Sequence, residues 1–145
     1  MIYVASPYSH VDHVVRELRY QETQSYVAQL FEKKLWAFSP ILHCHALAHA
    51  FDLPTDAEYW KEYNLHMLAR ADELHVLQLT GWRESEGVRN EIFFWKALKN
   101  DPEILTAKPD KRGLIPYYAE DLLNQMEPSH DTDTRKDGLH VRSTD

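Results

Sequence analysis

The sequence predicts an α/β protein with a parallel sheet, and three observations lead to this fold class. Residues 2–5 and residues 35–38 are short apolar segments, each followed directly by Ser-Pro, which ends a strand. Between them, no proline or glycine occurs from Tyr8 to Ser39, and apolar residues recur at helical spacing over 11–33. A strand, a helix and a strand in this order form a βαβ unit, whose two strands are parallel.

The middle of the chain continues this alternation. Residues 41–54 are mixed and rich in histidine, and we expect a short helix and a loop there. Thr55 and Glu58 have the spacing of a capping box, with Thr55 as the N-cap of a helix over about 56–70. The apolar segment over 73–79 predicts a third strand.

In the last third of the chain, the sequence predicts one helix strongly and other secondary structure only weakly. Residues 88–98 are apolar on one side and predict a helix. Weak strand signals lie around 104–105 and 114–115, and a short helix is expected over 118–126. Residues 127–145 contain almost no apolar side chains, so we expect a disordered polar tail.

Length and composition narrow the class of protein. The 145 residues suit one domain, which we place at 1–126, and 43% hydrophobic residues exclude a disordered chain. The formal net charge of −7 comes without a basic stripe, so no nucleic-acid polymer is expected as a partner. The single cysteine, Cys44, excludes an internal disulfide and a CxxC zinc site. No apolar segment approaches the length of a membrane span, and residues 1–8 are too short and too polar for a signal peptide, so we expect a cytoplasmic protein without membrane contact.

Asn64 interrupts an apolar stripe. The stripe belongs to the helix over 56–70 and also holds Trp60, Met67 and Leu68. An asparagine in that stripe is buried or faces a cleft, and it needs hydrogen-bond partners there. A bond to a neighbouring backbone group is an equally good explanation.

Glu91 is a second polar residue in an apolar stripe. It lies near the start of the helix over 88–98 and aligns with Phe94, Trp95 and Leu98. This alignment directs the carboxylate into the protein or into a cleft, whereas a surface glutamate at a helix start is the simpler alternative. The helix N-terminus favours the ionised form of Glu91.

The loops after the first and third strands are expected to meet. In open parallel sheets, ligands bind beyond the carboxyl ends of the strands, near a topological switch point. The loops over 6–9 and 81–87 both lie at that edge, with Glu91 at its rim. Ser85, Gly87 and the first helical amides would form a nest for an anion.

Three histidines lie close together at positions 43, 45 and 49. His45 and His49 are four residues apart and could bind a metal from one helix face. No carboxylate accompanies them at motif spacing, so we favour polar lining or ring stacking on a ligand, and we expect neither a metal nor a cofactor. Trp82, in the loop before Glu91, is a candidate for covering a ligand.

Three elements, in this order, resemble the nucleoside 2-deoxyribosyltransferase superfamily. Residues 3–10 read YxASPYSH, residues 39–43 read SPIxH, and residues 81–92 read GWxxSxGVxxEI. The resemblance spans residues 1–100, approximately. It implies a flavodoxin-like (Rossmann-like) three-layer sandwich with a parallel sheet of about five strands. It also implies a homo-oligomer, either a dimer or a tetramer.

The resemblance implies cleavage or transfer at the N-glycosidic bond of a 2'-deoxynucleoside or its 5'-monophosphate. Glu91 matches the nucleophile of this superfamily, and Tyr3 matches an active-site tyrosine. Ser85 matches a residue that contacts the 5'-phosphate in the nucleotide hydrolase branch. Position 64 departs from the pattern, because asparagine replaces a catalytic aspartate and cannot act as an acid or a base at neutral pH.

Three functional hypotheses follow. In the first, Glu91 attacks C1' to form a covalent glycosyl-enzyme, Asn64 positions the substrate, and Tyr8 and His43 are candidates for protonating the leaving base. In the second, the same pocket binds a nucleotide without cleaving it. In the third, the three histidines hold a metal for hydrolysis. The expected substrate contacts are Ser6, Tyr8, His43, Trp82, Ser85 and Gly87, while Arg16, Arg19 and Arg83 are either phosphate ligands or surface charges.

Overall fold

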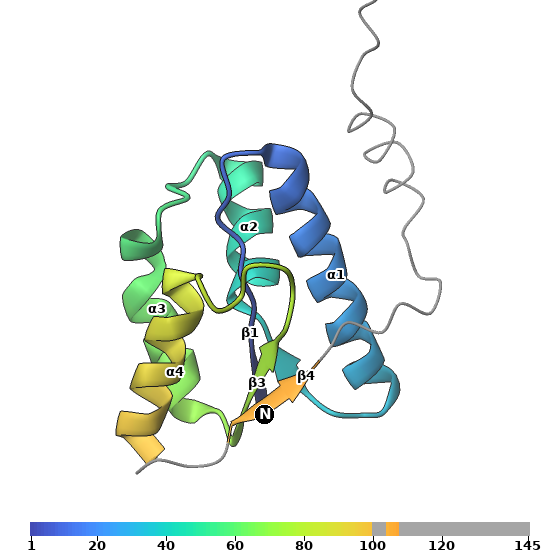
Figure 1. The fold of residues 1–145 in the computed structure, drawn as a ribbon, viewed down its shortest axis with the longest axis vertical. Helices are drawn as coiled ribbons and strands as arrows, with labels where there is room; N and C mark the ends of the chain where they lie inside the picture. The colour runs from blue at the N-terminus through green and yellow to red at the C-terminus, as the bar shows by residue number, and fades with distance from the viewer. Residues whose placement is uncertain (100–103, 108–145) are drawn as a thin grey trace, which may run out of the picture.

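The computed structural model describes residues 1–99 and 104–107. Helices and strands alternate through these residues, except that two successive helices lie between the second and third strands, as the sequence predicts. In chain order they are β1 (Ile2–Ala5), α1 (His13–Glu32), β2 (Ala37–Phe38), α2 (Pro40–Phe51), α3 (Ala57–Arg70), β3 (Glu73–Leu77), α4 (Glu86–Lys99) and β4 (Leu105–Ala107) (Figure 1).

The strands form one parallel sheet in the order β2-β1-β3-β4. All four residues of β1 are buried, because this strand lies inside the sheet with helices over both faces. The described residues contain four strands, where the sequence led us to expect about five. The expected strand around 114–115, the helix over 118–126 and the tail over 127–145 lie outside the described residues.

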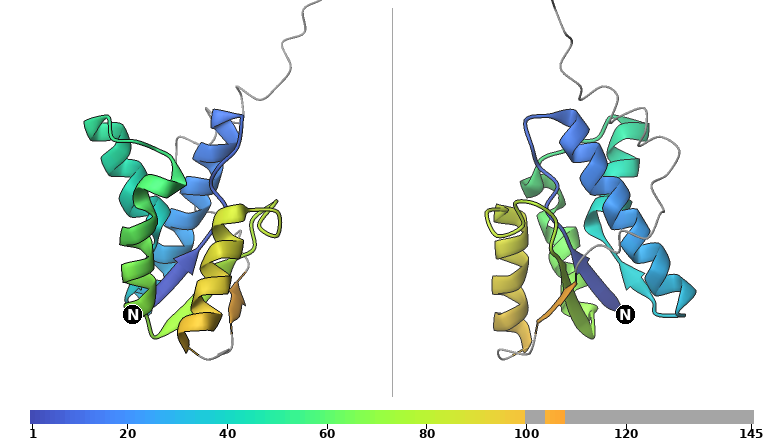
Figure 2. Two further views of the ribbon diagram at one scale, coloured as in Figure 1. Left: turned by 90° about the vertical axis from the view of Figure 1, so that its left-hand side faces the viewer. Right: turned by 45° about the vertical axis from the view of Figure 1, so that its right-hand side comes forward.

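The helices make three layers with the sheet. Val27 and Leu30 of α1 pack on one face, against Ile2, Val4 and Leu77. On the other face, a second cluster joins α3 and α4 to the sheet, and Figure 2 shows α1 and α4 on opposite sides of the strands. Its buried members are Tyr3, Ala5, Leu68, Ala71, Leu74, Val76, Val88 and Trp95. The architecture is thus α/β, with a parallel sheet between helical layers.

Two element starts differ from the prediction. Asp56, and not Thr55, is the N-cap of α3, because its Oδ1 accepts a hydrogen bond of 2.9 Å from the Tyr59 amide. β2 begins at Ala37 and not at residue 35, since only Ala37 and Phe38 pair with β1 in register.

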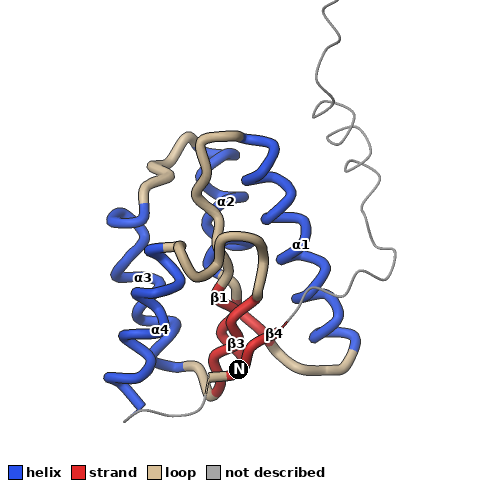
Figure 3. Tube along the Cα trace, in the orientation of Figure 1, coloured by secondary structure: helices blue, strands red, loops and turns tan. Residues whose placement is uncertain are grey.

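None of the helices in the described part of the chain combines the length and the apolar character needed to cross a bilayer. The loops that follow β1 and β3 leave the sheet at the same end, which is the carboxyl end of the strands (Figure 3). In parallel sheets this end is where ligands bind.

Candidate active site

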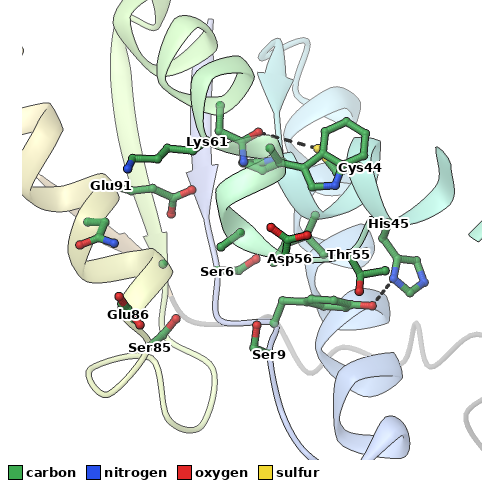
Figure 4. A pocket seen from close by; sticks show the side chains of 18 of the residues that line it. Ser6, Ser9, Cys44, His45, Thr55, Asp56, Lys61, Ser85, Glu86 and Glu91 are labelled. Carbon is green, nitrogen blue, oxygen red and sulfur yellow. Dashed lines mark hydrogen bonds between the residues drawn. The ribbon is translucent and has the colours of Figure 1, made fainter. Parts of the chain in front are cut away.

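A cleft with a volume of about 700 Å³ lies at this end of the sheet. Its walls come from the loop after β1, from α2, from the start of α3 and from the start of α4 (Figure 4). The lining includes most of the residues that the sequence singled out: Tyr3, Ser6, Tyr8, Asn64, Ser85, Gly87 and Glu91. These positions are distant in sequence, and the parallel topology brings them together.

Glu91 and Tyr3 form a hydrogen-bonded pair in the cleft. The Tyr3 hydroxyl donates to Oε1 of Glu91 over 2.8 Å, and Tyr3 itself is 0% exposed. Burial raises the pKa of Glu91 to about 7, although the hydrogen bond from Tyr3 acts in the opposite direction. The helix N-terminus is expected to favour the ionised form of Glu91, but the net shift is towards the protonated form, because desolvation by burial is the largest effect.

Asn64 reaches the same cleft from α3. The thiol of Cys44 on α2 donates to Oδ1 of Asn64 at an S–O distance of 3.8 Å. Burial raises the pKa of Cys44 to about 11, so the thiol keeps its proton and can act as this donor. Oδ1 keeps a second lone pair, so Asn64 can still accept one hydrogen bond, and its amide nitrogen can donate.

The opposite wall carries a chain of polar side chains. The Tyr8 hydroxyl and Nδ1 of His45 share a hydrogen bond, and Nε2 of His45 lies 3.9 Å from Oε2 of Glu17. Burial lowers the pKa of His45, and the neighbouring His49 lowers it further. Ser6 accepts a hydrogen bond of 3.1 Å from the Thr23 hydroxyl. Tyr8 and Ser6 are thus held in place by α1 and α2.

Ser85 stands at the start of α4. Its hydroxyl oxygen accepts from the Val88 amide over 3.4 Å, and its carbonyl accepts from the Arg89 amide over 3.0 Å. Both bonds fix the entry to the helix that carries Glu91. Gly87, one turn before Glu91, completes this rim of the cleft.

Two predicted contacts do not line the cleft. His43 is exposed, and its ring stacks on Tyr63 with 5.4 Å between centroids. Trp82 packs against the core cluster of the α3 and α4 face, and the guanidinium of Arg83 covers its ring at 4.7 Å. Contacts with other residues of the chain thus hold both side chains outside the cleft.

The histidines do not converge as the metal hypothesis requires. The rings of His45 and His49 are 4.3 Å apart, whereas His43 is held by Tyr63. Among the described residues, no group of three or more histidine, cysteine or acidic side chains is arranged to hold a metal ion.

Several lining residues were not singled out by the sequence. The sequence places Trp60 in the apolar stripe of Asn64 without assigning it to the cleft. Lys61 lies three residues before Asn64 on α3, so helical spacing from Asn64 could have identified it. Asp56 lines the cleft besides capping α3, and Asn90 precedes Glu91 on α4. No local signal marks Asn90.

No curated protein matches the chain. The family described as "Domain of unknown function (DUF1937)" matches residues 1–105. This match covers β1 and β3, the loops that follow them and the helices that carry Asn64 and Glu91. The chain therefore belongs to the DUF1937 family.

Proposed function

We propose that the protein cleaves or transfers at the N-glycosidic bond of a 2'-deoxynucleoside or its 5'-monophosphate, with Glu91 as the nucleophile. The observation that carries this proposal is the pairing of Glu91 with the buried Tyr3 hydroxyl at 2.8 Å, inside a cleft of about 700 Å³. A carboxylate on a rigid helix, oriented by a fixed donor, is suited to attack an anomeric carbon. The resemblance to nucleoside 2-deoxyribosyltransferases supports the same assignment.

The reaction proceeds in two steps. An oxygen of Glu91 forms a bond to C1', the bond from C1' to the base nitrogen breaks, and its electron pair leaves with the base. A water molecule or a second base then attacks C1', and the ester bond to Glu91 breaks. The carboxylate recovers its electron pair, and the proton of the attacking group passes to solvent.

The ionisation of Glu91 sets the pH dependence of the first step. Only the carboxylate is a nucleophile, and burial raises the pKa of Glu91 to about 7. Activity should therefore rise as the pH increases through about 7.

The fold is compatible with this proposal. The order β2-β1-β3-β4 equals the first four strands of a flavodoxin-like sheet, whose ligands bind at the switch point between the first and third strands. We extend the proposal to a flavodoxin-like, cytoplasmic protein that forms a homo-oligomer, with a small nucleoside or nucleotide as its partner.

A second candidate function is nucleotide binding without turnover. Asn64 favours it, since an asparagine in the cleft cannot supply the proton that a neutral leaving base requires. In that case ligands would raise the melting temperature without giving a product.

A chromatographic assay for free base separates the two candidates. Wild type, Glu91→Gln and the control Glu62→Gln are incubated with 2'-deoxynucleosides and their 5'-monophosphates. Glu62 lies exposed on α3 and does not line the cleft. We expect base release by wild type and by the control, and none by Glu91→Gln. Melting shifts without release by wild type would favour the binding function.

A further inference from the structure

The cleft is strongly acidic. Its described lining contains five carboxylate side chains, Asp56, Glu58, Glu84, Glu86 and Glu91, and a single lysine or arginine, Lys61. Nζ of Lys61 lies 3.2 Å from Oε2 of Glu58, so this cation is already paired. Glu84 and Glu86 flank Ser85, where the resemblance places a phosphate contact. A phosphate at this rim would lie among like charges.

The arginines that could have held a phosphate have other roles. Arg19 donates to the carbonyls of Ser9 and Thr80, each over 2.8 Å, and ties two loops together. Arg16 donates to the carbonyl of His10, and Arg83 lies over Trp82. None of the three lines the cleft. The electrostatics of the cleft therefore favour a neutral or positively charged ligand.

Asn64 adds an independent constraint. It occupies the position at which the resembling enzymes hold an aspartate, and its amide has no proton to give to a departing base. The Cys44 thiol donates to its Oδ1, and Asn64 can exchange hydrogen bonds with a ligand but transfers no proton to it. A base that leaves as an anion therefore receives no proton from Asn64, and the carboxylates of the cleft disfavour its negative charge.

Both constraints are met by one class of substrate. Resting on the proposed function, we infer that the preferred substrate is a 2'-deoxynucleoside whose base already carries a positive charge, such as an N7-alkylated purine. Glu91 forms the bond to C1', the bond from C1' to N9 breaks, and the electron pair neutralises the charge on the departing base. The step needs no proton from the protein.

The charge of such a ligand also assists the nucleophile. A cation bound near Glu91 favours its ionised form, whereas a phosphate would favour the protonated form. The aromatic rings of Tyr8, Trp60 and Phe94 line the cleft as well, and their faces attract cations. A positive charge on the base thus both strengthens binding and increases the reactivity of Glu91.

Kinetics with two substrates test the inference. We would compare N7-methyl-2'-deoxyguanosine with 2'-deoxyguanosine, using Glu91→Gln to subtract the uncatalysed release. For wild type we expect kcat/KM to be at least about 100-fold higher for the methylated substrate, the typical contribution of a general acid. Asn64→Asp should raise kcat/KM for deoxyguanosine by at least about 10-fold and change it less than about threefold for the methylated substrate.

The results separate the inference from the proposed function. Equal Glu91-dependent kcat/KM for both substrates would overturn the inference alone, because another group would then supply the proton. If Asn64→Asp raises kcat/KM equally for both substrates, the inference would be overturned as well. No Glu91-dependent release from either substrate would overturn the proposed function and the inference with it.

Binding provides a readout that does not depend on turnover. In the Glu91→Gln background, titration calorimetry should show at least about tenfold tighter binding of N7-methyl-2'-deoxyguanosine than of 2'-deoxyguanosine 5'-monophosphate. Adding Glu84→Gln and Glu86→Gln should reduce this ratio, and added salt should reduce it too. Adding Glu62→Gln, outside the cleft, should leave it unchanged. A tighter complex with the monophosphate would overturn the inference.

Discussion

Two tyrosines form hydrogen bonds of the same length on opposite faces of the sheet. Tyr3 donates to Glu91 over 2.8 Å on the α4 face, and the Tyr26 hydroxyl lies 2.8 Å from Nδ1 of His75 on the α1 face. The His75 ring is closed off on its other side, since Nε2 is 3.0 Å from Oε2 of Glu73. Tyr26 and His75 do not line the cleft, whereas Tyr3 and Glu91 do. The bond between Tyr26 and His75 therefore joins α1 to β3 and has a structural role. The bond between Tyr3 and Glu91 also lowers the pKa of an acid that a ligand in the cleft can reach.

The ionisation of buried Glu91 should lower the free energy of unfolding at neutral and higher pH. Its pKa is raised from 4.5 to about 7, so the folded protein binds more protons than the unfolded chain between these values. The free energy of unfolding therefore falls as the pH rises through this interval, by about 2 to 3 kcal/mol for this partly exposed group.

In Glu91→Gln, the free energy of unfolding should not show the fall that ionisation of Glu91 causes. We expect its free energy of unfolding to exceed that of wild type by about 2 kcal/mol at pH 8, with the difference disappearing towards pH 4.5. Urea titrations at several pH values measure this. Glu62→Gln should follow wild type, and a Glu91→Gln curve parallel to wild type would show that Glu91 has an ordinary pKa.

Phenylalanine substitutions test the two tyrosines directly. The hydrogen bond from Tyr3 lowers the pKa of Glu91, so Tyr3→Phe should shift the rising limb of the pH–activity profile to higher pH by about one unit. Activity at pH 7 should fall about fivefold, because the ionised fraction of Glu91 falls from about one half to about one tenth. Tyr26→Phe should reduce stability by about 1 kcal/mol and leave the pH profile in place. Equal pH profiles for both variants would remove the functional difference between the two pairs.

Much of this fold could be predicted because its signals are local. The bounds predicted for β1, α1, α3 and β3 lie within two residues of those observed, since apolar periodicity and Ser-Pro breaks are read directly from the chain. β2 is shorter than predicted because pairing with β1, and not the apolar character of residues 35–36, decides where it begins.

The site was only partly predictable. Asn64 and Glu91 could be identified because each interrupts an apolar stripe, and the structure places both in the cleft. The Tyr3–Glu91 bond joins residues 88 positions apart, so neither it nor the raised pKa of Glu91 has a local signal. The positions of His43 and Trp82 depend on stacking with Tyr63 and Arg83, which spacing along the chain does not reveal.

The smallest expected effect concerns the cap of α3, which holds Asp56 at the cleft. Asp56→Ala should lower the free energy of unfolding by about 1 kcal/mol, because the Tyr59 amide loses its acceptor. Asp56→Asn should retain the cap and its stability while removing one negative charge from the cleft. Thermal melts of both variants measure this, and equal losses would show that the charge, and not the cap, stabilises the helix.

Mass spectrometry can show whether Glu91 becomes covalently glycosylated during the reaction. Wild type is mixed with a 2'-deoxynucleoside that it cleaves, quenched in acid within the first turnover and digested. We expect the peptide containing Glu91 to gain the mass of one deoxyribosyl group, and we expect Glu91→Gln neither to gain this mass nor to release base. Release of base by Glu91→Gln at the wild-type rate would show that Glu91 is not the nucleophile.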